Sequence, residues 1–311
     1  MNNYRFISKC IIALLSCIIG LTSCGDKIPT NEIHYTTADN SVLPIKNLFY
    51  FGEGRIVSNS YVPDKNVCIL KLDKDVTEIG GEAFDGYESL TSITIPESVT
   101  EIGEGAFSHC SNLTFITLPE SLTEIEKRAF SRCSSLTSIS IPQSVTEIGE
   151  CAFFRCSSLT SISIPPSVTE IGHRAFLGCS SLTSITIPPS VTKIGGSAFN
   201  GCSGLTSITV SKDNKVYDSR ENCNAIIHTE NNTLIRGCEN STIPPSVTKI
   251  GGFAFYGCSS LTSITIPPSV TEIRGWTFRG CSSLTEVRIP KGCNVDEDAF
   301  KDCPNVQIIR Y

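Results

Sequence analysis

The chain has 311 residues, of which 40% are hydrophobic and 18% are charged, and its formal net charge is −6 at pH 7. This is enough apolar material for a large core and too little charge for a disordered chain. An acidic chain does not attract nucleic acid through its overall charge, so we expect no nucleic-acid partner.

Residues 1–23 have the pattern of a signal peptide. Arg5 and Lys9 precede an apolar run at positions 10–21, which is shorter than the roughly 20 residues that a membrane-spanning helix requires. A positive start followed by a short apolar run is typical of a cleaved export signal. The alternative interpretation is an N-terminal membrane anchor.

The apolar run ends in the sequence LTSCG at positions 21–25, which resembles the lipobox of bacterial lipoproteins. The resemblance implies that Cys24 becomes the first residue of the mature chain and carries lipid. Acyl chains contribute about 0.8 kcal/mol per buried CH₂ and hold a protein on a membrane without a spanning helix. We therefore expect an exported protein that is lipid-anchored to the bacterial outer membrane or cell surface.

Residues 24–65 are polar and irregular, and we expect a lipid-anchored tether followed by an N-terminal cap. Residues 33–37 and 41–45 flank the short sequence ADN at positions 38–40, which favours a β-hairpin. The aromatic run FYF at positions 49–51 is expected to cover the first repeat.

Residues 66–311 repeat with a period of 23 residues, marked by one phenylalanine in each unit. These phenylalanines are Phe84, Phe107, Phe130, Phe153, Phe176, Phe199, Phe255, Phe278 and Phe300. The interval between Phe199 and Phe255 is two periods plus ten residues. We therefore predict one irregular, enlarged coil, with an insert at about residues 211–243 that projects a hairpin.

Each unit also places apolar residues at fixed distances from its phenylalanine. After Phe107 come Leu113, Ile116 and Leu118, and a proline follows. Two apolar residues separated by one residue share a strand face, and the proline removes a ladder donor and ends the strand. The pattern predicts a β-rich leucine-rich-repeat solenoid of 23-residue coils, with a parallel β-sheet on one face and short turns or 3-10 helices elsewhere.

The sequence CSSLTSITIPPSVTKIG at positions 179–195 resembles the BspA-like leucine-rich-repeat family of bacterial surface proteins, and variants of it cover residues 66–311. Val67, Leu70 and Leu72 occupy the strand positions before Phe84, so we expect the solenoid to begin there. The resemblance implies a protein that adheres to host extracellular proteins or to other bacteria.

Eight of the sixteen cysteines recur three residues after the phenylalanine: Cys110, Cys133, Cys156, Cys179, Cys202, Cys258, Cys281 and Cys303. Equivalent positions of stacked coils project in parallel, whereas a disulfide requires particular Cβ geometry. We therefore predict a column of buried thiols, with a Cys223–Cys238 bridge as the alternative in the insert. Because no Cys-x-x-Cys pair occurs, we expect no zinc.

No motif of a hydrolase, phosphate loop or metalloprotease occurs, and the four histidines are scattered without an expected serine, cysteine or acid partner. We therefore expect no enzyme, no catalytic residue, no cofactor and no metal site. Six residues before the phenylalanine lies a column of carboxylates: Glu78, Glu101, Glu124, Glu147 and Glu170. We interpret it as a solvated edge, and calcium bridging between coils is the alternative.

The positions beside each phenylalanine vary most between units. They include Lys127, Arg128, Arg132, Phe154, Arg155, Arg174, Phe253, Tyr256, Trp276 and Arg279. Because arginine and aromatic residues are enriched in interface hot spots, these positions predict a binding ridge for a protein ligand; tolerant exposed turns are the alternative. The hydroxyls of the strand face, such as Ser138 and Ser140, favour a second function, a glycan-binding or scaffolding module of the cell envelope.

Overall fold

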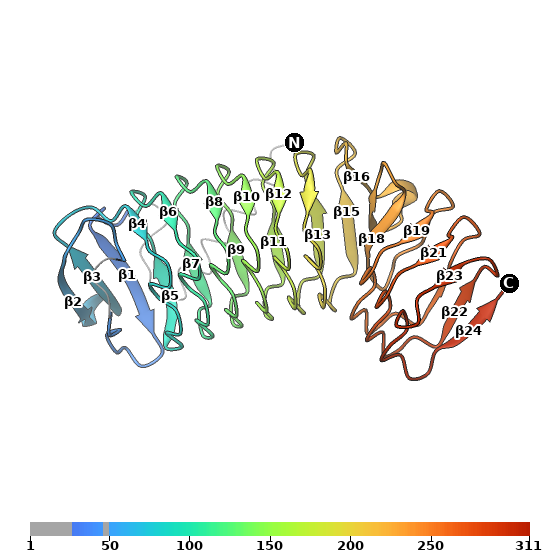
Figure 1. The fold of residues 1–311 in the computed structure, drawn as a ribbon. Helices are drawn as coiled ribbons and strands as arrows, with labels where there is room; N and C mark the ends of the chain where they lie inside the picture. Colours follow the sequence, from blue (N-terminus) through green and yellow to red (C-terminus); the bar gives the residue numbers. More distant parts are fainter. Residues whose placement is uncertain (1–26, 46–49) are drawn as a thin grey trace, which may run out of the picture.

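A computed structural model describes residues 27–45 and 50–311 as an elongated stack of coils (Figure 1). The predicted signal peptide and Cys24 lie outside the described residues, as does Phe49. Within the part of the chain that is described, no helix is both long and apolar enough to cross a membrane. The predicted solenoid is therefore confirmed for these residues, and almost all of its regular structure is β.

The N-terminal cap is a mixed sheet rather than the predicted hairpin. Its elements are β1 (Glu32–Thr37), β2 (Ile56–Val62), the 3-10 helix η1 (Pro63–Lys65) and β3 (Val67–Leu72). Strand β1 pairs antiparallel with β3 on one side and with β5 on the other. Residues 41–45 form no strand, because both edges of β1 are already occupied. The Tyr35 hydroxyl accepts a hydrogen bond from the Leu43 N–H at 3.0 Å and fixes that segment instead.

Strand β1 is inserted between the segment expected to open the solenoid and the next coil. Strand β3 does carry Val67, Leu70 and Leu72, but β1 separates it from β5. The side chains of Ile33 and Tyr35 on β1 are fully buried in the same core. In the row that contains β5, the direct parallel ladder between successive coils therefore begins at that strand.

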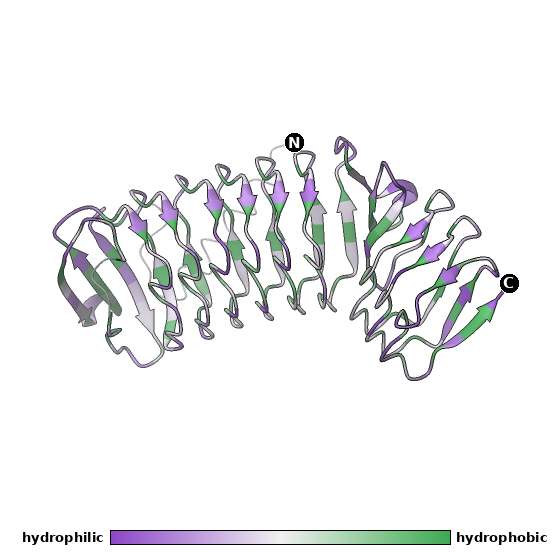
Figure 2. Cartoon of the chain, viewed as in Figure 1, coloured by the Kyte–Doolittle hydropathy of each residue, from purple (hydrophilic) through white to green (hydrophobic). Residues whose placement is uncertain are grey.

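Two rows of parallel strands follow along the coils. The first row contains β5 (Leu90–Thr94), β7 (Phe115–Thr117), β9 (Ser138–Ser140), β11 (Ser161–Ser163), β13 (Ser184–Ile187) and β15 (Ser207–Val210). The second row contains two-residue strands: β4 (Glu78–Ile79), β6 (Glu101–Ile102), β8 (Glu124–Ile125), β10 (Glu147–Ile148), β12 (Glu170–Ile171) and β14 (Lys193–Ile194). The second row was not predicted. Each strand places a polar residue before an isoleucine, as the hydropathy colours show (Figure 2), and the isoleucine is buried in all of them except β14.

The phenylalanines form one column in the core. From Phe84 to Phe199 consecutive rings stack with centroids 5.2–5.6 Å apart and planes within 12° of parallel. The thiols form a second column, in which Cys133 donates to the Phe107 carbonyl at 3.1 Å and Cys156 to the Phe130 carbonyl at 3.0 Å. All described cysteines are buried and free, so the thiol column is confirmed and the alternative bridge in the insert is absent.

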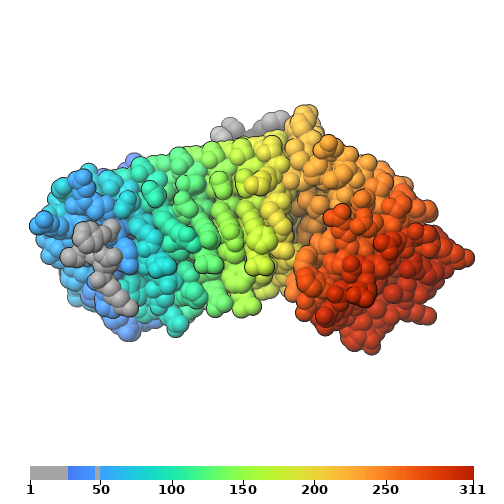
Figure 3. Space-filling view, viewed as in Figure 1, coloured from blue at the N-terminus to red at the C-terminus, as the bar shows by residue number. Residues whose placement is uncertain are grey.

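The insert divides the stack into two parts. It contains β16 (Tyr217–Asp218), the 3-10 helix η2 (Arg220–Asn222) and the antiparallel pair β17 (Ala225–His228) and β18 (Thr233–Gly237). The C-terminal part contains β19 (Lys249–Ile250), β20 (Ser263–Thr265), β21 (Glu272–Ile273), β22 (Glu286–Ile289), β23 (Asn294–Val295) and β24 (Gln307–Arg310). The core separates into two clusters at this point, where the stack changes direction (Figure 1) and its surface is notched (Figure 3).

Both rows of strands are interrupted at the insert, because β14 and β18 belong to different sheets, and the second row resumes from β18 onward. Strand β18 pairs in parallel with β19, but β15 and β20 belong to different sheets. The side chain of Asn224 covers the open edge of β15: its Nδ2 donates to the Thr206 carbonyl at 2.8 Å, and its Oδ1 accepts the Ile208 N–H. One amide side chain thereby replaces part of the missing strand.

Candidate functional site: a ridge of left-handed residues

Each coil turns tightly around its phenylalanine, and in every coil except that of Phe300 the residues two before and two after it both have a positive φ. In the coil of Phe130 these are Arg128 (57°) and Arg132 (61°). Glycine occupies equivalent positions in other coils, for example Gly105 and Gly178. A non-glycine residue costs about 1–2 kcal/mol in this left-handed conformation. The turn therefore favours glycine at both positions.

The basic patch comprises the six predicted residues of the N-terminal stack: Lys127, Arg128, Arg132, Phe154, Arg155 and Arg174. Its four arginines are exposed, and none of them forms an ion pair with a residue that the structure describes. The guanidinium carbons of Arg132 and Arg155 lie 5.9 and 5.3 Å from the centre of the Phe154 ring. Only Lys127 has an acidic partner, Glu104, at 3.5 Å.

The aromatic patch comprises the four predicted residues of the C-terminal stack: Phe253, Tyr256, Trp276 and Arg279. The Phe253 ring centre lies 5.1 Å from that of Trp276 and 5.8 Å from that of Tyr256. Arg279 covers the Trp276 ring at 5.8 Å, and its Nε donates to Asp302 Oδ2 at 2.8 Å. This hydrogen bond is the main reason that the pKa of Arg279 is raised. The coils that carry these residues have their core in a different cluster from the coils of the basic patch.

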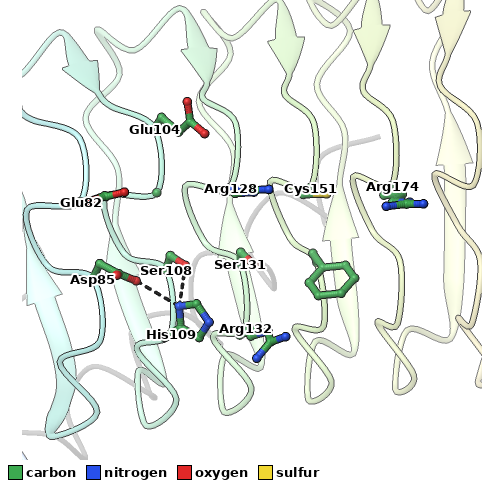
Figure 4. A pocket seen from close by; sticks show the side chains of 12 residues that line it. Glu82, Asp85, Glu104, Ser108, His109, Arg128, Ser131, Arg132, Cys151 and Arg174 are labelled. Atoms are coloured by element: carbon green, nitrogen blue, oxygen red, sulfur yellow. Dashed lines mark hydrogen bonds and ion pairs between the residues drawn. The ribbon is translucent and has the colours of Figure 1, made fainter.

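A groove of about 340 Å³ runs along the basic patch (Figure 4). Glu82, Asp85 and Glu104 line one end, and Arg128, Arg132 and Arg174 line the other. The groove therefore has acidic and basic ends. Figure 4 shows Arg128, Cys151 and Arg174 following one another across successive coils, with Glu82 two coils before Arg128, as expected for equivalent positions of a repeat.

One histidine in the groove does have partners that the sequence analysis did not predict. Nδ1 of His109 lies 3.1 Å from Asp85 Oδ1 and 2.9 Å from Ser108 Oγ. A Ser-His-Asp triad needs serine and aspartate on opposite ring nitrogens, whereas both groups here contact the same nitrogen. Cys151 is also no activated nucleophile, because burial, and then the Glu150 carboxylate, raise the pKa of its thiol. The groove contains a polar cluster without the geometry of acyl transfer.

The carboxylate column and the hydroxyl face differ in their exposure to solvent and in their partners. Desolvation is the largest cause that raises the pKa of Glu124, followed by its acidic neighbours, while Lys193 pairs with Glu170 at 2.6 Å and ends the column. Over residues 27–45 and 50–311, no group of three or more histidine, cysteine or acidic residues is arranged to hold a metal ion. Most hydroxyls of the first strand row are exposed, although Ser92 is buried under the cap.

The stacked coils and their Leu-x-x-Ile-x-Ile strands define this protein as a leucine-rich-repeat solenoid. The family model described as BspA type leucine rich repeat region matches residues 55–157, 123–235 and 236–311, in six copies. The chain therefore belongs to the BspA-type leucine-rich-repeat family.

Solved structures include similar stacks. A leucine rich cell surface protein from Faecalibacterium prausnitzii A2-165 is 26% identical, with a TM-score of 0.52 over 93% of this chain and 95% of that chain. The pneumococcal vaccine antigen PcpA is 23% identical, with a TM-score of 0.62 over 88% of this chain and 72% of that chain, and its similarity shows the fold alone. A comparison with curated proteins found no match.

The left-handed conformation of the ridge was not anticipated from the sequence. Its signal was present in the second position after the phenylalanine, where Gly86, Gly178, Gly201, Gly257 and Gly280 recur. A position that is often glycine and otherwise arginine, histidine or aspartate indicates a backbone constraint rather than a tolerant turn.

Proposed function

We propose that this protein is a non-enzymatic lipoprotein of the bacterial cell envelope that binds another protein through the basic patch. The proposed role is adhesion to host extracellular proteins or to other bacteria. Membership of the BspA-type family and the similar cell surface protein support display at the surface. The lipobox-like LTSCG sequence supports a lipid anchor at Cys24.

The observation that carries this proposal is the conformation of the arginines. Arg128, Arg132, Arg155 and Arg174 all have φ between 55° and 61°, where each side chain costs about 1–2 kcal/mol relative to an unstrained residue. None gains an internal ion pair among the described residues. Backbone strain that the fold does not require is typical of functional positions, which supports an external role for these guanidinium groups.

The chemistry of the patch favours an acidic segment of a protein as the ligand. Guanidinium groups bind carboxylates through paired hydrogen bonds, and successive coils present Arg128, Arg132, Arg155 and Arg174 along the stack. The ring of Phe154 lies between two of them and adds apolar contact area. A charged rim around an aromatic anchor is the usual composition of an interface hot spot.

The test is binding of the purified protein to immobilised extracellular-matrix glycoproteins, to proteins shed from bacterial surfaces and to polysaccharides. We expect capture by a protein ligand and at least a tenfold loss in an Arg128→Ala, Arg155→Ala, Arg174→Ala variant. The matched control replaces Lys212, Lys215 and Arg288, which are exposed cations off the basic patch. Equal binding by both variants would exclude the basic patch.

A second candidate function is glycan capture or scaffolding within the envelope, and the exposed strand-face hydroxyls favour it. Ser138, Ser140, Ser161 and Ser163 repeat at the spacing of the coils and suit a repetitive partner. Retention on polysaccharide that survives the arginine substitutions would support this function over the first. Protease shaving of intact cells tests the location, because a protein displayed outward is cleaved and one facing inward survives.

A further inference from the structure

The junction between the two stacks contains a buried cation without a counter-charge. Arg236, on β18, is only 3% exposed. Its Nη1 donates to the Tyr256 carbonyl at 3.1 Å, and its Nη2 lies 3.9 Å from Cys258 Sγ. Its Nε is buried and has no hydrogen-bond partner, and no described carboxylate forms an ion pair with it. A buried charge in this state is costly unless something compensates it.

The contacts of Arg236 follow from the interruption of the repeat. In regular coils the N–H two residues after the phenylalanine donates to the next coil, as Arg132 donates to the Phe154 carbonyl at 2.6 Å. At the junction, the guanidinium of Arg236 takes the equivalent acceptor, the Tyr256 carbonyl. The neighbouring Gly237 N–H takes the Ala254 carbonyl at 2.8 Å. The insert therefore uses acceptors that a regular coil would offer to the preceding coil.

The preceding coil is consequently left with free donors. Phe176 N–H donates to the Ala198 carbonyl at 2.8 Å, and Arg174 N–H donates to the Gly196 carbonyl at 3.1 Å. The corresponding N–H groups of Ser197 and Phe199 have no hydrogen-bond partner among the residues that the structure describes. In regular coils these groups point along the stack, so here they point toward the insert.

These donors surround one cavity. A cavity of about 350 Å³ is lined by Ser197, Phe199, Arg236, His228 and Arg274, among others, and by no aspartate or glutamate. Nδ1 of His228 is also buried without a hydrogen-bond partner. Arg274, which donates through Nε to the half-buried Glu272 at 3.2 Å, adds a second guanidinium to the lining.

We propose that this junction cavity binds the oxyanion of a small ligand, a carboxylate, sulfate or phosphate group on a molecule no larger than a monosaccharide. The free Nε of Arg236 supplies a charge-assisted hydrogen bond, and the N–H groups of Ser197 and Phe199 supply a concave pair of backbone donors of the kind that bind anions. The volume matches small-ligand sites, which measure roughly 300–1,000 Å³. The site is independent of the basic patch and of the protein ligand proposed above.

The test is isothermal titration calorimetry of the full-length protein with sodium phosphate, sodium sulfate and sodium glucuronate. Sodium chloride at matched ionic strength is the reference that removes general salt effects. We expect saturable binding of one equivalent by at least one oxyanion. Binding of phosphate or sulfate alone identifies an inorganic anion, whereas preference for glucuronate identifies a carboxylate carried on a sugar.

Two variants assign the binding to the cavity. Arg236→Met keeps an extended apolar side chain and removes the charge, and we expect it to weaken binding at least tenfold. His228→Phe retains the ring that packs edge-on against Tyr217, removes Nδ1, and is expected to weaken binding at least threefold even if the first variant does not fold. Arg288→Met, an exposed cation outside both the cavity and the basic patch, is the control and should bind normally.

The proposal is overturned if the three oxyanions give no heat beyond that of chloride. It is also overturned if His228→Phe and any folded Arg236→Met variant bind as tightly as the unmodified protein, because the anion would then lie elsewhere. Loss of protein capture by the basic-patch variant with retained oxyanion binding separates this proposal from the proposed function.

Discussion

Replacing Arg128 and Arg174 together by glycine should make the protein more stable while weakening its binding. Each arginine is exposed, has a positive φ and has no hydrogen-bond or ion-pair partner through its side chain. Relief of the left-handed conformation contributes about 1–2 kcal/mol per site. The larger entropy of glycine in the unfolded chain offsets roughly 0.5–1 kcal/mol of this. The net expectation is about 1–2 kcal/mol for the pair.

The assay is urea unfolding followed by circular dichroism, with a higher midpoint and an unchanged slope as the expected result. Arg132 and Arg155 provide an internal comparison, because each also stacks on Phe154 and loses about 0.5–1 kcal/mol of cation–π attraction when replaced. Their glycine variants should therefore be close to neutral. Lys127→Gly is the matched control, since Lys127 has no positive φ, and it should lower stability by roughly 0.5–1 kcal/mol.

A lower midpoint for the Arg128→Gly, Arg174→Gly protein would refute the reasoning, because the ridge would then not be strained. If the variant is more stable but still captures the protein ligand, the two arginines are strained but are not needed for binding.

Three further predictions concern the core and the junction. Phe130→Ala should lower the free energy of unfolding by about 3–5 kcal/mol, since its fully buried ring is stacked on both sides. Phe300→Ala should lower it by less than half of this, because that ring is half-buried and stacked on one side only. Chemical unfolding of both variants checks the difference. Burial raises the pKa of the Cys110 and Cys156 thiols to about 12, so they stay protonated in the folded protein while unfolded thiols ionise near pH 9. The contribution of these thiols to the free energy of unfolding should therefore be fully present below pH 9 and should fall between pH 9 and 12, by about 1.4 kcal/mol per thiol at pH 10. A Cys110→Ala, Cys156→Ala variant should show a shallower decline of stability with pH. Asn224→Ala should lower the free energy of unfolding by about 1–3 kcal/mol, because it leaves the Ile208 N–H of β15 without a partner, whereas the Thr206 carbonyl keeps the Asn240 amide. An unchanged unfolding midpoint would contradict the role given to this amide.

The solenoid could be predicted from the repeat because every coil buries apolar side chains at the same positions. The spacing of Leu113 and Ile116 after Phe107 determines which residues point inward, and no long-range information is needed. The cap has no such repetition. Its strand β1 pairs with β5, a contact between segments distant in sequence, and a local turn signal could only suggest a hairpin with the residues that follow.

The same limit explains the errors at the candidate sites. The hydroxyls of the strand face were predicted as a possible binding surface, but that of Ser92, on the same face, is covered by the Thr36 hydroxyl of β1, which lies 2.6 Å from it. His109 was expected to have no partner, because Asp85 is brought to it by stacking rather than by sequence proximity. The ridge positions were defined by their distance from each phenylalanine, whereas a left-handed backbone cannot be read from the sequence when arginine stands where glycine would be preferred.

The junction and the ridge share one physical feature, which is that stability of the solenoid does not explain their side chains. Glycine at position 128 would relieve the left-handed turn, and methionine at position 236 would remove an uncompensated buried charge, a change that is often neutral or stabilising in protein interiors. The repeat itself shows a residue that fits this turn without strain, since Gly105 occupies the position of Arg128 in the preceding coil. Residues that cost folding free energy where a better-folding alternative exists are explained by contacts outside the chain. The two sites therefore have to be tested with different ligands, a protein for the ridge and a small anion for the junction.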